Sequence, residues 1–577
     1  MDKKIGVAKI EMNVVLGRTV LSKCIHRNPL RIQPMPRASA CLAGSASAVI
    51  SSLGGGLLGC DEVQVDVSVG PNAKGWLGTQ SSTKIYKKDP HNVNQGTRSC
   101  LKVKVAAGGM LVWAPDALVP YKDSIYRSKS SFEIDASAHF VSVEWTQSGR
   151  AHSGERWELG FYETISQWHI VNGGSDIQQI RDATRLKNAQ TAQVALDLGG
   201  QSRDVFGTVA LYNVPLVAKR FDKAARAAAT RRGARIHHQY GEQTNSCENP
   251  SDVIISGLAA MGISPCLGIH NNKNDNPFLL VRFVAFDVEG AYRILHWCLA
   301  PLKTKIGFAP YSDRIHARGQ TNHLNRFFFE KPNLDLSPPP NSNEKLTIHL
   351  SPLAFMLADS ALPTGGFAHS GGLEAALQMG ILRPNDETTL LQVISNLAMN
   401  QHSLYAPFAF AAMQQHIENY DDFLMMLDEN LDALLCSHAQ AHLASTRQGA
   451  ALNRICNSMI TNYTGAKLRH GAIAFGVLAK HMALSAEAML LVFVHTAIRD
   501  AFSAAVRLGI IGPLAALPLQ AKVFRHFAHT SAISHVIPYT EKHSYDDDTH
   551  LFSASSAPFL DALHASHSLL DMRLFQS

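Results

Sequence analysis

The sequence predicts a multidomain protein in which a mostly antiparallel β domain with a few helices precedes an all-α helical bundle. The chain length, a change in the spacing of apolar residues at mid-chain and a proline-rich segment between the halves lead to this prediction. At 577 residues, the chain exceeds the roughly 250–300 residues at which a single hydrophobic core stops growing. Hydrophobic residues make up 46% of the chain, which is typical of folded globular domains.

Apolar and polar residues alternate in the first half. In the stretch DEVQVDVSVG, from Asp61 to Gly70, the alternate residues are valines, so one face of a strand is apolar. Similar runs at 101–113, 131–145 and 155–170 are separated by glycine, proline, asparagine and serine. We therefore expect antiparallel strands, with helices only near 215–235 and 288–302.

The second half carries apolar residues at spacings of three and four, and almost no strand-like alternation remains. The segment from Ser485 to Leu508 is apolar nearly all round, which places it at the centre of a helical bundle. This half is therefore predicted to be all-α.

A polar, proline-rich segment separates the two halves. The stretch EKPNLDLSPPPNSNEKLTIHL, residues 330–350, contains three consecutive prolines and no periodic apolar face. Such a segment favours extended backbone and has too little apolar surface to offset the entropy of ordering. We predict a β-rich domain at 1–330, a linker at 331–345 and an all-α domain at 346–577.

Charge and cysteine usage exclude several classes of protein. A net charge of +6 is small for this length, and the basic cluster at 219–235 has no interleaved aromatic residue except Phe221, so no nucleic-acid partner is expected. No uncharged apolar run reaches the roughly 18 residues of a membrane span, and no secretory signal is visible. The nine cysteines form no CxxC pair, which indicates reduced thiols and a cytoplasmic protein.

Motifs for common enzyme chemistry are missing from the sequence. It contains no phosphate-binding GxxxxGK[ST] loop, dinucleotide fingerprint, HExxH or GxSxG. The histidine-rich segment HSYDDDTH, His543 to His550, could hold a divalent ion through its imidazoles and Asp546, Asp547 and Asp548. A polar loop without a specific metal is the favoured interpretation, there and at His237–His238.

The first half resembles urease accessory protein UreD, also called UreH. The resemblance rests on the glycine run and strand of LGGGLLGCDEVQVDVSVG and on TQSSTKIYK. It continues through VWAPDALVPY, VEWTQSGRAHSGERWEL and IRDATRL, and covers residues 1 to 325. One departure is Cys60, because the family usually has glycine before the acidic residue. No metal role is favoured for this cysteine.

The second half resembles another urease accessory protein, UreF. The stretch ADSALPTGGFAHSGGLEAAL, residues 358–377, is similar to the UreF opening, and STRQGAALNRI and RDAFSAAVRLGIIGPLAALPLQ continue the likeness over 346–577. The chain as a whole therefore resembles a fusion of UreD with UreF.

The resemblance implies a non-catalytic maturation scaffold. The UreD-like and UreF-like halves would bind each other, possibly in a dimer of the fused chain, and would recruit the nickel-carrying GTPase UreG and apo-urease. The scaffold would support nickel insertion into urease. Ni²⁺ would pass in transit without being stably bound, and GTP would be bound only by the partner, which agrees with the missing phosphate loop.

Three acidic residues lie at positions that resemble acidic tunnel positions of UreD. They are, in order of preference, Asp61, Asp182 and Glu144. A divalent ion needs a hydrated route whose carboxylates bind weakly enough to release it. An ordinary turn or ion-pair role is the alternative for each residue.

The UreF resemblance implies a partner-binding strip that follows LPTGG, together with residues near the end of the chain. Its members are Phe367, His369, Ser370, Glu374, Arg573 and Phe575. The guanidinium of Arg573 suits a carboxylate or backbone carbonyl of a partner. A terminal, solvated charge is the alternative for this arginine.

Two other functions stay open. The first is an autonomous nickel-binding or storage protein that uses the histidine-rich segments. The second is a hydrolase with an unfamiliar site around Asp61, Glu144 and His169.

Overall fold

The structure is a computed structural model that describes residues 5–35, 40, 43–87, 96–150, 153–173, 175–198, 201–230, 253–255, 278–316, 352–413, 420–436, 438–460, 468–530, 553–570 and 573–577. The predicted linker at 331–345 lies outside the described residues, as do the segment 543–550 and His237–His238. The chain divides into two compact units, one mainly within residues 5–316 and the other mainly within 352–577.

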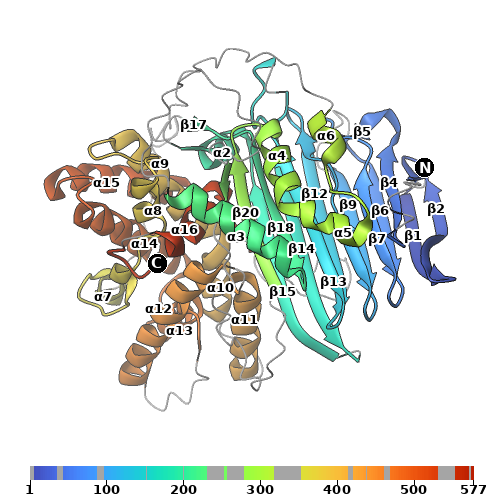
Figure 1. The fold of residues 1–577 in the computed structure, drawn as a ribbon. Coiled ribbons are helices and arrows are strands. Elements are labelled where there is room, and N and C mark those ends of the chain that lie inside the picture. The colour runs from blue at the N-terminus through green and yellow to red at the C-terminus, as the bar shows by residue number, and fades with distance from the viewer. Residues whose placement is uncertain are drawn as a thin grey trace. The chain divides into compact units, whose positions relative to one another are not determined.

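The first unit is built on two large sheets (Figure 1). Sheet A has the order β15 (Ser175–Leu186), β14 (Phe161–Asn172), β12 (Ile125–Asp135), β9 (Thr97–Val105), β6 (Glu62–Val69), β1 (Gly6–Val15) and β2 (Arg18–Arg27). Sheet B has the order β19 (Val253–Ile255), β20 (Phe278–Ala285), β18 (Val205–Tyr212), β13 (His139–Gln147), β10 (Met110–Trp113), β7 (Lys74–Thr79), β4 (Ala46–Ser52) and β3 (Leu30–Pro34). The short strands β5 (Gly56–Leu57), β8 (Thr83–Ile85) and β11 (Leu118–Pro120) join sheet B, and β16 (Asp197–Leu198) pairs with β17 (Gln201–Ser202).

The pairing direction differs from the antiparallel expectation. The successive pairs β1–β6, β6–β9, β9–β12 and β12–β14 of sheet A are all parallel, and the sheet edges are antiparallel. The reason is that the chain crosses between the sheets. Along the sequence, β7 of sheet B comes between β6 and β9 of sheet A, and β13 of sheet B comes between β12 and β14 of sheet A. Each crossing reverses the chain, so the next strand in the same sheet runs parallel to the last. The alternation of apolar residues identifies strands but carries no information on their direction.

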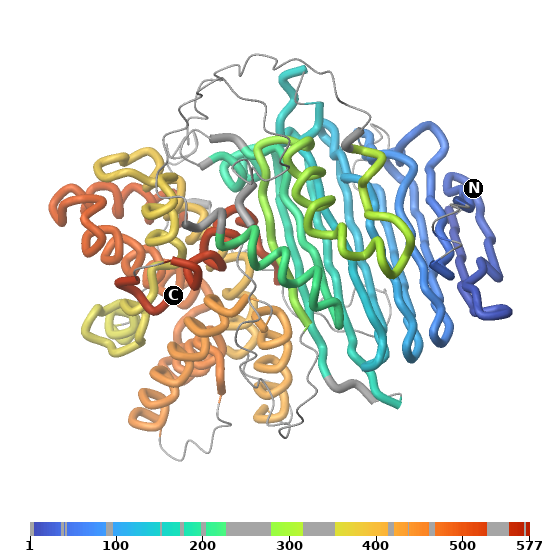
Figure 2. The backbone as a smooth tube through the Cα atoms, viewed as in Figure 1, coloured from blue at the N-terminus to red at the C-terminus, as the bar shows by residue number. Residues whose placement is uncertain are grey.

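Apart from β2 and β19 at the sheet edges, the strands follow one another across each sheet in chain order, as the colour of the first unit in Figure 2 shows. Large aromatic residues fill part of the space between the sheets. The ring of Phe132 stacks on Trp168 at 5.7 Å and lies 5.2 Å from Phe140. This end of the interior is therefore a packed apolar core.

Helices cover the outer face of sheet B (Figure 1). They are α3 (Pro215–Thr230), α4 (Val288–Leu299) and α5 (Lys303–Ile306), while α2 (Ala189–Leu196) contacts β15 and α6 (Ser312–His316) contacts α4. The Trp145 ring meets Tyr292 of α4 edge-on at 4.9 Å. Asp287 caps α4 by accepting a hydrogen bond from the Gly290 amide.

The regular elements described in the second unit are helices, joined by turns and short irregular segments. Its α-helices are α7 (Pro352–Ala358), α8 (Leu373–Gln378), α9 (Glu387–Asn400), α10 (Ala406–Met413), α11 (Tyr420–Leu435), α12 (Ala439–Met459), α13 (Gly471–His481), α14 (Ala486–Arg507), α15 (Pro513–Thr530) and α16 (Pro558–Ser566). A π-helical turn, Gln401–Tyr405, joins α9 to α10. A β-rich first part and an all-α second part are thus confirmed.

Helix α14 lies at the centre of this unit, as its apolar composition predicts. It contacts α7, α9, α10, α13 and α15. Within the described part of the chain, it alone is long and apolar enough to cross a membrane, and 56% of its most apolar window is buried. A core helix of a bundle passes the same test, so this helix is weak evidence for a membrane span.

Candidate functional site

A carboxylate lies between the two sheets of the first unit. Glu144 belongs to β13 of sheet B, and its two oxygens accept hydrogen bonds from strands of sheet A. Ser130 Oγ donates to Oε1 at 2.8 Å, and Ser166 Oγ donates to Oε2 at 2.5 Å. The side chain of Glu144 therefore bridges the sheets inside the unit.

A second carboxylate lies in the same layer. Asp182 pairs with Ser166 across β14 and β15, and its Oδ1 lies 2.7 Å from Nη2 of Arg282 on β20. On sheet B, Thr208 pairs with both Glu144 and Arg282. The two registers place two carboxylates, one guanidinium and several hydroxyls at one level between the sheets.

Burial raises the pKa of the Glu144 carboxyl, and the negative charge of Asp182 raises it further, against the hydrogen bonds from Ser166 and Ser130. The Arg282 side chain is 12% exposed and that of Asp182 is 15% exposed. The layer therefore holds two carboxyl groups and one guanidinium in a poorly solvated place. Deprotonation of Glu144 would leave one carboxylate uncompensated, and a cation entering the layer would stabilise that ionised form.

Hydroxyl groups continue from this layer toward one end of the strands. The Tyr162 hydroxyl lies 2.8 Å from Thr146 Oγ1, and the ring of Tyr126 lies 6.0 Å from that of Tyr162. Burial raises the pKa of both tyrosines, so both remain neutral at physiological pH. This end of the interior thus combines aromatic rings with hydroxyl groups, whereas the end at Phe132 is apolar.

Asp61 immediately precedes β6. Its carbonyl oxygen accepts a hydrogen bond from the Arg98 amide of β9, next to Thr97, which pairs with Tyr126. The carboxylate accepts a hydrogen bond from the Leu58 amide at 2.8 Å and thereby closes an exposed turn. The structure thus brings Glu144 and Asp182 together, whereas Asp61 is four residues before Val65, the β6 residue level with that layer.

The turn before Asp61 has unusual backbone conformations. Gly54 and Gly55 adopt φ of 74° and 73°, as expected for a tight turn of glycines. Cys60 has φ of 123°, a value that favours glycine and costs other residues on the order of 1–3 kcal/mol. This conformation explains why glycine suits the position.

His169 does not join the carboxylates. It pairs with Glu133 on β12, and it is three residues from Ser166, whose hydroxyl reaches Glu144. Because side chains alternate along a strand, His169 points to the opposite face of sheet A. The three residues of the hydrolase hypothesis are therefore not assembled.

The second unit holds its last residues against the predicted strip. Glu374 of α8 is 2% exposed. Its Oε1 accepts from the Leu574 amide at 2.6 Å, and its Oε2 accepts from the Phe575 amide at 3.1 Å and lies 2.8 Å from His567 Nε2. One buried carboxylate thus fixes the course of residues 574–575.

Ser577 makes the next contacts. Its carbonyl oxygen accepts from the Ser370 amide at 2.7 Å, and its hydroxyl lies 2.6 Å from His369 Nδ1. His369 and Ser370 are 7% and 1% exposed. These strip residues face inward and hold the end segment.

Two arginines of α14 connect the remaining strip residues. The Arg507 guanidinium lies 4.5 Å from the Phe575 ring centre, and that of Arg499 lies 5.1 Å from the Phe367 ring centre. Phe575 is buried, whereas Arg573 and its neighbour Leu574 are exposed. The structure therefore assembles all six predicted residues in one neighbourhood, and of these Arg573 offers a charged side chain to solvent.

Acid should weaken this arrangement. Burial lowers the pKa of His369 to about 4 and that of His564 to about 3, helped by neighbouring positive groups. Both lie below the unfolded value of about 6.5, so stability is intact above that pH and is lost as pH falls toward the folded values. For His369 alone we expect a loss on the order of 3 kcal/mol, measured by urea unfolding followed by circular dichroism between pH 7.5 and pH 4.5.

His369→Asn removes this titration and should flatten the pH dependence. The matched control is His481→Asn, because His481 is exposed at the end of α13. An equal pH dependence in the wild type and in His369→Asn would contradict the assignment.

Comparisons with known proteins follow the same division of the chain. The sequence model of the family described as "UreD urease accessory protein" matches residues 4–317. "Urease accessory protein UreD" from Sorangium cellulosum is 35% identical over 190 residues, which span 33% of this chain and only 56% of that protein. "Urease accessory protein D" from Arabidopsis thaliana is 23% identical over 316 residues, which span 53% of this chain and 100% of that protein.

The UreF family model matches residues 385–523. "Urease accessory protein F" from Arabidopsis thaliana is 32% identical over 238 residues, which span 39% of this chain and 91% of that protein. The chain belongs to the UreD and UreF families. It is a UreD–UreF fusion, and both families indicate a role in urease maturation. The first unit is hereafter the UreD unit and the second the UreF unit.

The sequence alone did not identify several residues of the UreD site. Ser130, Ser166 and Arg282 contact the acidic residues, yet they are distant in sequence and belong to other strands. A signal was present in the inward positions of YRSKS, 126–130, and YETIS, 162–166, where hydroxyl side chains recur with period two. Hydroxyl side chains on the buried face of a strand indicate a polar interior.

Proposed function

We propose that the UreD–UreF fusion is a non-catalytic scaffold that binds apo-urease and a nickel-carrying GTPase of the UreG type and supports nickel insertion into urease. GTP is bound by the GTPase, and Ni²⁺ passes through the scaffold as cargo. The UreD and UreF units bind each other, and the fused chain acts alone or as a dimer. The layer of Glu144 and Asp182 between the two sheets is the observation that supports this proposal best.

The composition of that layer suits an ion in transit. Stripping a divalent ion of water in a low-dielectric interior is costly, so its route needs oxygen ligands along its length. Hydroxyls and carboxylates are hard ligands, and the interior between Tyr162 and Glu144 offers both. Because Arg282 offsets part of the negative charge, the layer attracts a cation without holding it tightly. In this proposal Asp61 lies at the entrance of the nickel route.

The strip of the UreF unit serves partner recognition. Arg573 offers its guanidinium to an acidic partner surface, and the exposed side chain of Leu574, 65% accessible, adds apolar contact. The buried residues Glu374, His369 and Ser370 act indirectly by fixing the segment that carries them.

Nickel delivery by the variant Glu144→Gln tests the proposal. Glutamine keeps the size of the side chain but removes its charge. One serine hydroxyl can still donate to the amide oxygen and the other can turn to accept from the amide NH2, so the fold should persist. We expect nickel transfer to apo-urease to fall by about tenfold or more, the factor that corresponds to 1.4 kcal/mol. The measurement is the nickel content and activity of urease after incubation with the fusion and the GTPase loaded with GTP and Ni²⁺.

The matched control is Glu133→Gln, because Glu133 lies on an exposed position of β12 and pairs with Lys104. Co-purification with the GTPase and apo-urease should be unchanged in both variants, which separates delivery from assembly. Full urease activation by Glu144→Gln would remove this residue from the route, and failure of the wild-type chain to bind either partner would overturn the scaffold itself.

A further inference from the structure

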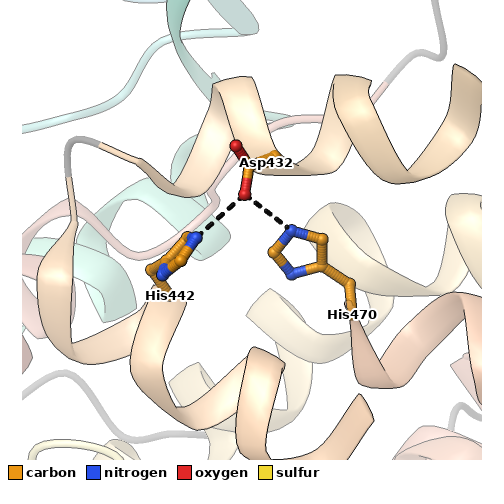
Figure 3. A group of neighbouring side chains, drawn as sticks. All are labelled: Asp432, His442 and His470. Atoms are coloured by element: carbon orange, nitrogen blue, oxygen red, sulfur yellow. Dashed lines mark hydrogen bonds and ion pairs between the residues drawn. The ribbon is translucent and has the colours of Figure 1, made fainter. Parts of the chain in front are cut away.

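Three potential metal ligands converge in the UreF unit, far in sequence from the strip (Figure 3). Asp432 belongs to α11, His442 belongs to the first turn of α12, and His470 immediately precedes α13. The Nε2 atoms of His442 and His470 lie 2.9 Å and 3.2 Å from Asp432 Oδ1. All three ligand atoms lie within 4.8 Å of one another.

These separations match those of ligands on a metal ion. Protein nitrogen and oxygen atoms bind first-row divalent metals at about 2.0–2.2 Å. Two ligands of one such ion are therefore about 3.0 Å apart at a right angle and about 3.4 Å apart at a tetrahedral angle. The two measured separations from Asp432 Oδ1 fall in or next to this range. The two contacts of Asp432 thus already have coordination spacing.

Neighbouring groups fix the ligands from behind. Ser445 Oγ lies 3.0 Å from Nδ1 of His470, and a serine hydroxyl can either donate or accept there. His470 can therefore carry its proton on Nδ1 and leave Nε2 free for a metal. Asp428 accepts the His470 amide at 3.0 Å and holds the backbone in place.

The cluster is also shielded from solvent. His470 is fully buried, and the side chains of Asp432 and His442 are 11% and 12% exposed. Burial opposes ionisation of Asp432, but hydrogen bonds from His442 and His470 and the charge of Arg469 hold its pKa below the usual range.

Arg469 competes for the same oxygen. Its Nη1 lies 3.1 Å from Asp432 Oδ1, while its Nε lies 2.9 Å from Asp428. The side chain of Arg469 is 36% exposed, so its Nη1 can turn away while Nε stays on Asp428. The guanidinium thus neutralises Asp432 when no metal is bound, and metal binding must displace it.

We propose that Asp432, His442 and His470 form an exchangeable site for a first-row divalent transition metal such as Ni²⁺, Co²⁺ or Zn²⁺. Two imidazoles and one carboxylate suit these ions better than Mg²⁺ or Ca²⁺, which prefer oxygen alone. Three protein ligands leave further positions for water, which favours exchange over permanent retention. The site belongs to the UreF unit and goes beyond the carboxylates proposed for nickel transit.

Titration of the full chain with Co²⁺ and Ni²⁺ tests this site. Calorimetry should show one ion bound per chain at the cluster, and bound Co²⁺ should give a visible absorption band of nitrogen–oxygen coordination. His442→Ala and Asp432→Asn should each weaken binding at least tenfold, since loss of even an outer-shell partner typically costs 10–100-fold. The matched control His481→Ala, at an exposed position of α13, should bind like the wild type.

Arg469→Gln distinguishes a metal site from a purely structural ion-pair cluster. Removing the competing cation should tighten metal binding several-fold, whereas a structural cluster would lose stability without gaining affinity. Metal-induced thermal stabilisation supplies a second measurement, because each variant is compared with itself with and without metal. The proposal is overturned if His442→Ala and Asp432→Asn retain wild-type affinity, or if the wild type shows no cobalt band and no stabilisation. The outcome of the nickel-delivery assay with Glu144→Gln has no bearing on these metal-binding measurements, because Glu144 belongs to the UreD unit.

Discussion

Arg282→Met is expected to destabilise the UreD unit by about 3–5 kcal/mol, the cost of leaving one member of a buried ion pair without its partner. Asp182 would then face Glu144 across the layer between the sheets with no cation at hand. The measurement is urea unfolding followed by tryptophan fluorescence. This signal reports the UreD unit alone, because all six tryptophans lie in it: Trp76, Trp113, Trp145, Trp157, Trp168 and Trp297.

Replacing both partners, as Arg282→Met with Asp182→Asn, should recover much of the stability because no unpaired charge remains. Arg293→Met is the control. Its partner is Glu289 on the exposed surface of α4, and such pairs contribute at most about 1 kcal/mol. Equal losses in both single variants would contradict a buried ionic layer.

Glu374→Ala should have a comparably large effect on the UreF unit. It removes the acceptor of two backbone amides and the partner of His567 at a position that is 2% exposed. Because charged hydrogen bonds in the interior are lost and donors are left unsatisfied, we expect a loss of about 3–5 kcal/mol. The variant should also release the end segment, and trypsin should then cleave after Arg573 at least about 100-fold faster if local opening becomes easier by some 3 kcal/mol.

Circular dichroism and mass spectrometry of the tryptic fragments measure the two effects. Glu429→Ala serves as the matched control, because Glu429 is exposed in the middle of α11; its effect should stay within about 0.5 kcal/mol. If trypsin cleaves Glu374→Ala at the wild-type rate, contacts other than those of Glu374 hold the end segment. The contacts of Ser577 would then be the first to examine.

The sequence predicts single strands and helices well because their signals are local. The valines of DEVQVDVSVG form the inward face of β6, at Glu62–Val69, and the apolar run at 485–508 becomes the central α14. The direction of strand pairing was not predicted. Apolar and polar residues alternate in the same way whether the chain continues into the same sheet or crosses to the other sheet.

The sites were only partly predictable. Resemblance pointed to Glu144 and Asp182, but their hydrogen-bond and ionic partners come from strands that the sequence separates widely. Likewise, Glu374 was placed in the strip, yet its contacts with Leu574 and Phe575 depend on a tertiary arrangement that helical periodicity does not encode. The Asp432 cluster draws on three helices and has no compact motif that a search for metal spacing would find.

The pairing of Asp182 with Arg282 bears on how the protein is made. The two residues are 100 positions apart, and a ribosome adding about 5–20 residues per second needs several seconds or more to cover that distance. Until β20 emerges, sheet A exposes a carboxylate whose counter-ion does not yet exist, and closing the sheets over it would be unfavourable. The nascent β-sandwich should therefore remain open and chaperone-accessible until nearly all of it has been synthesised, whereas the helices that follow can form as they appear.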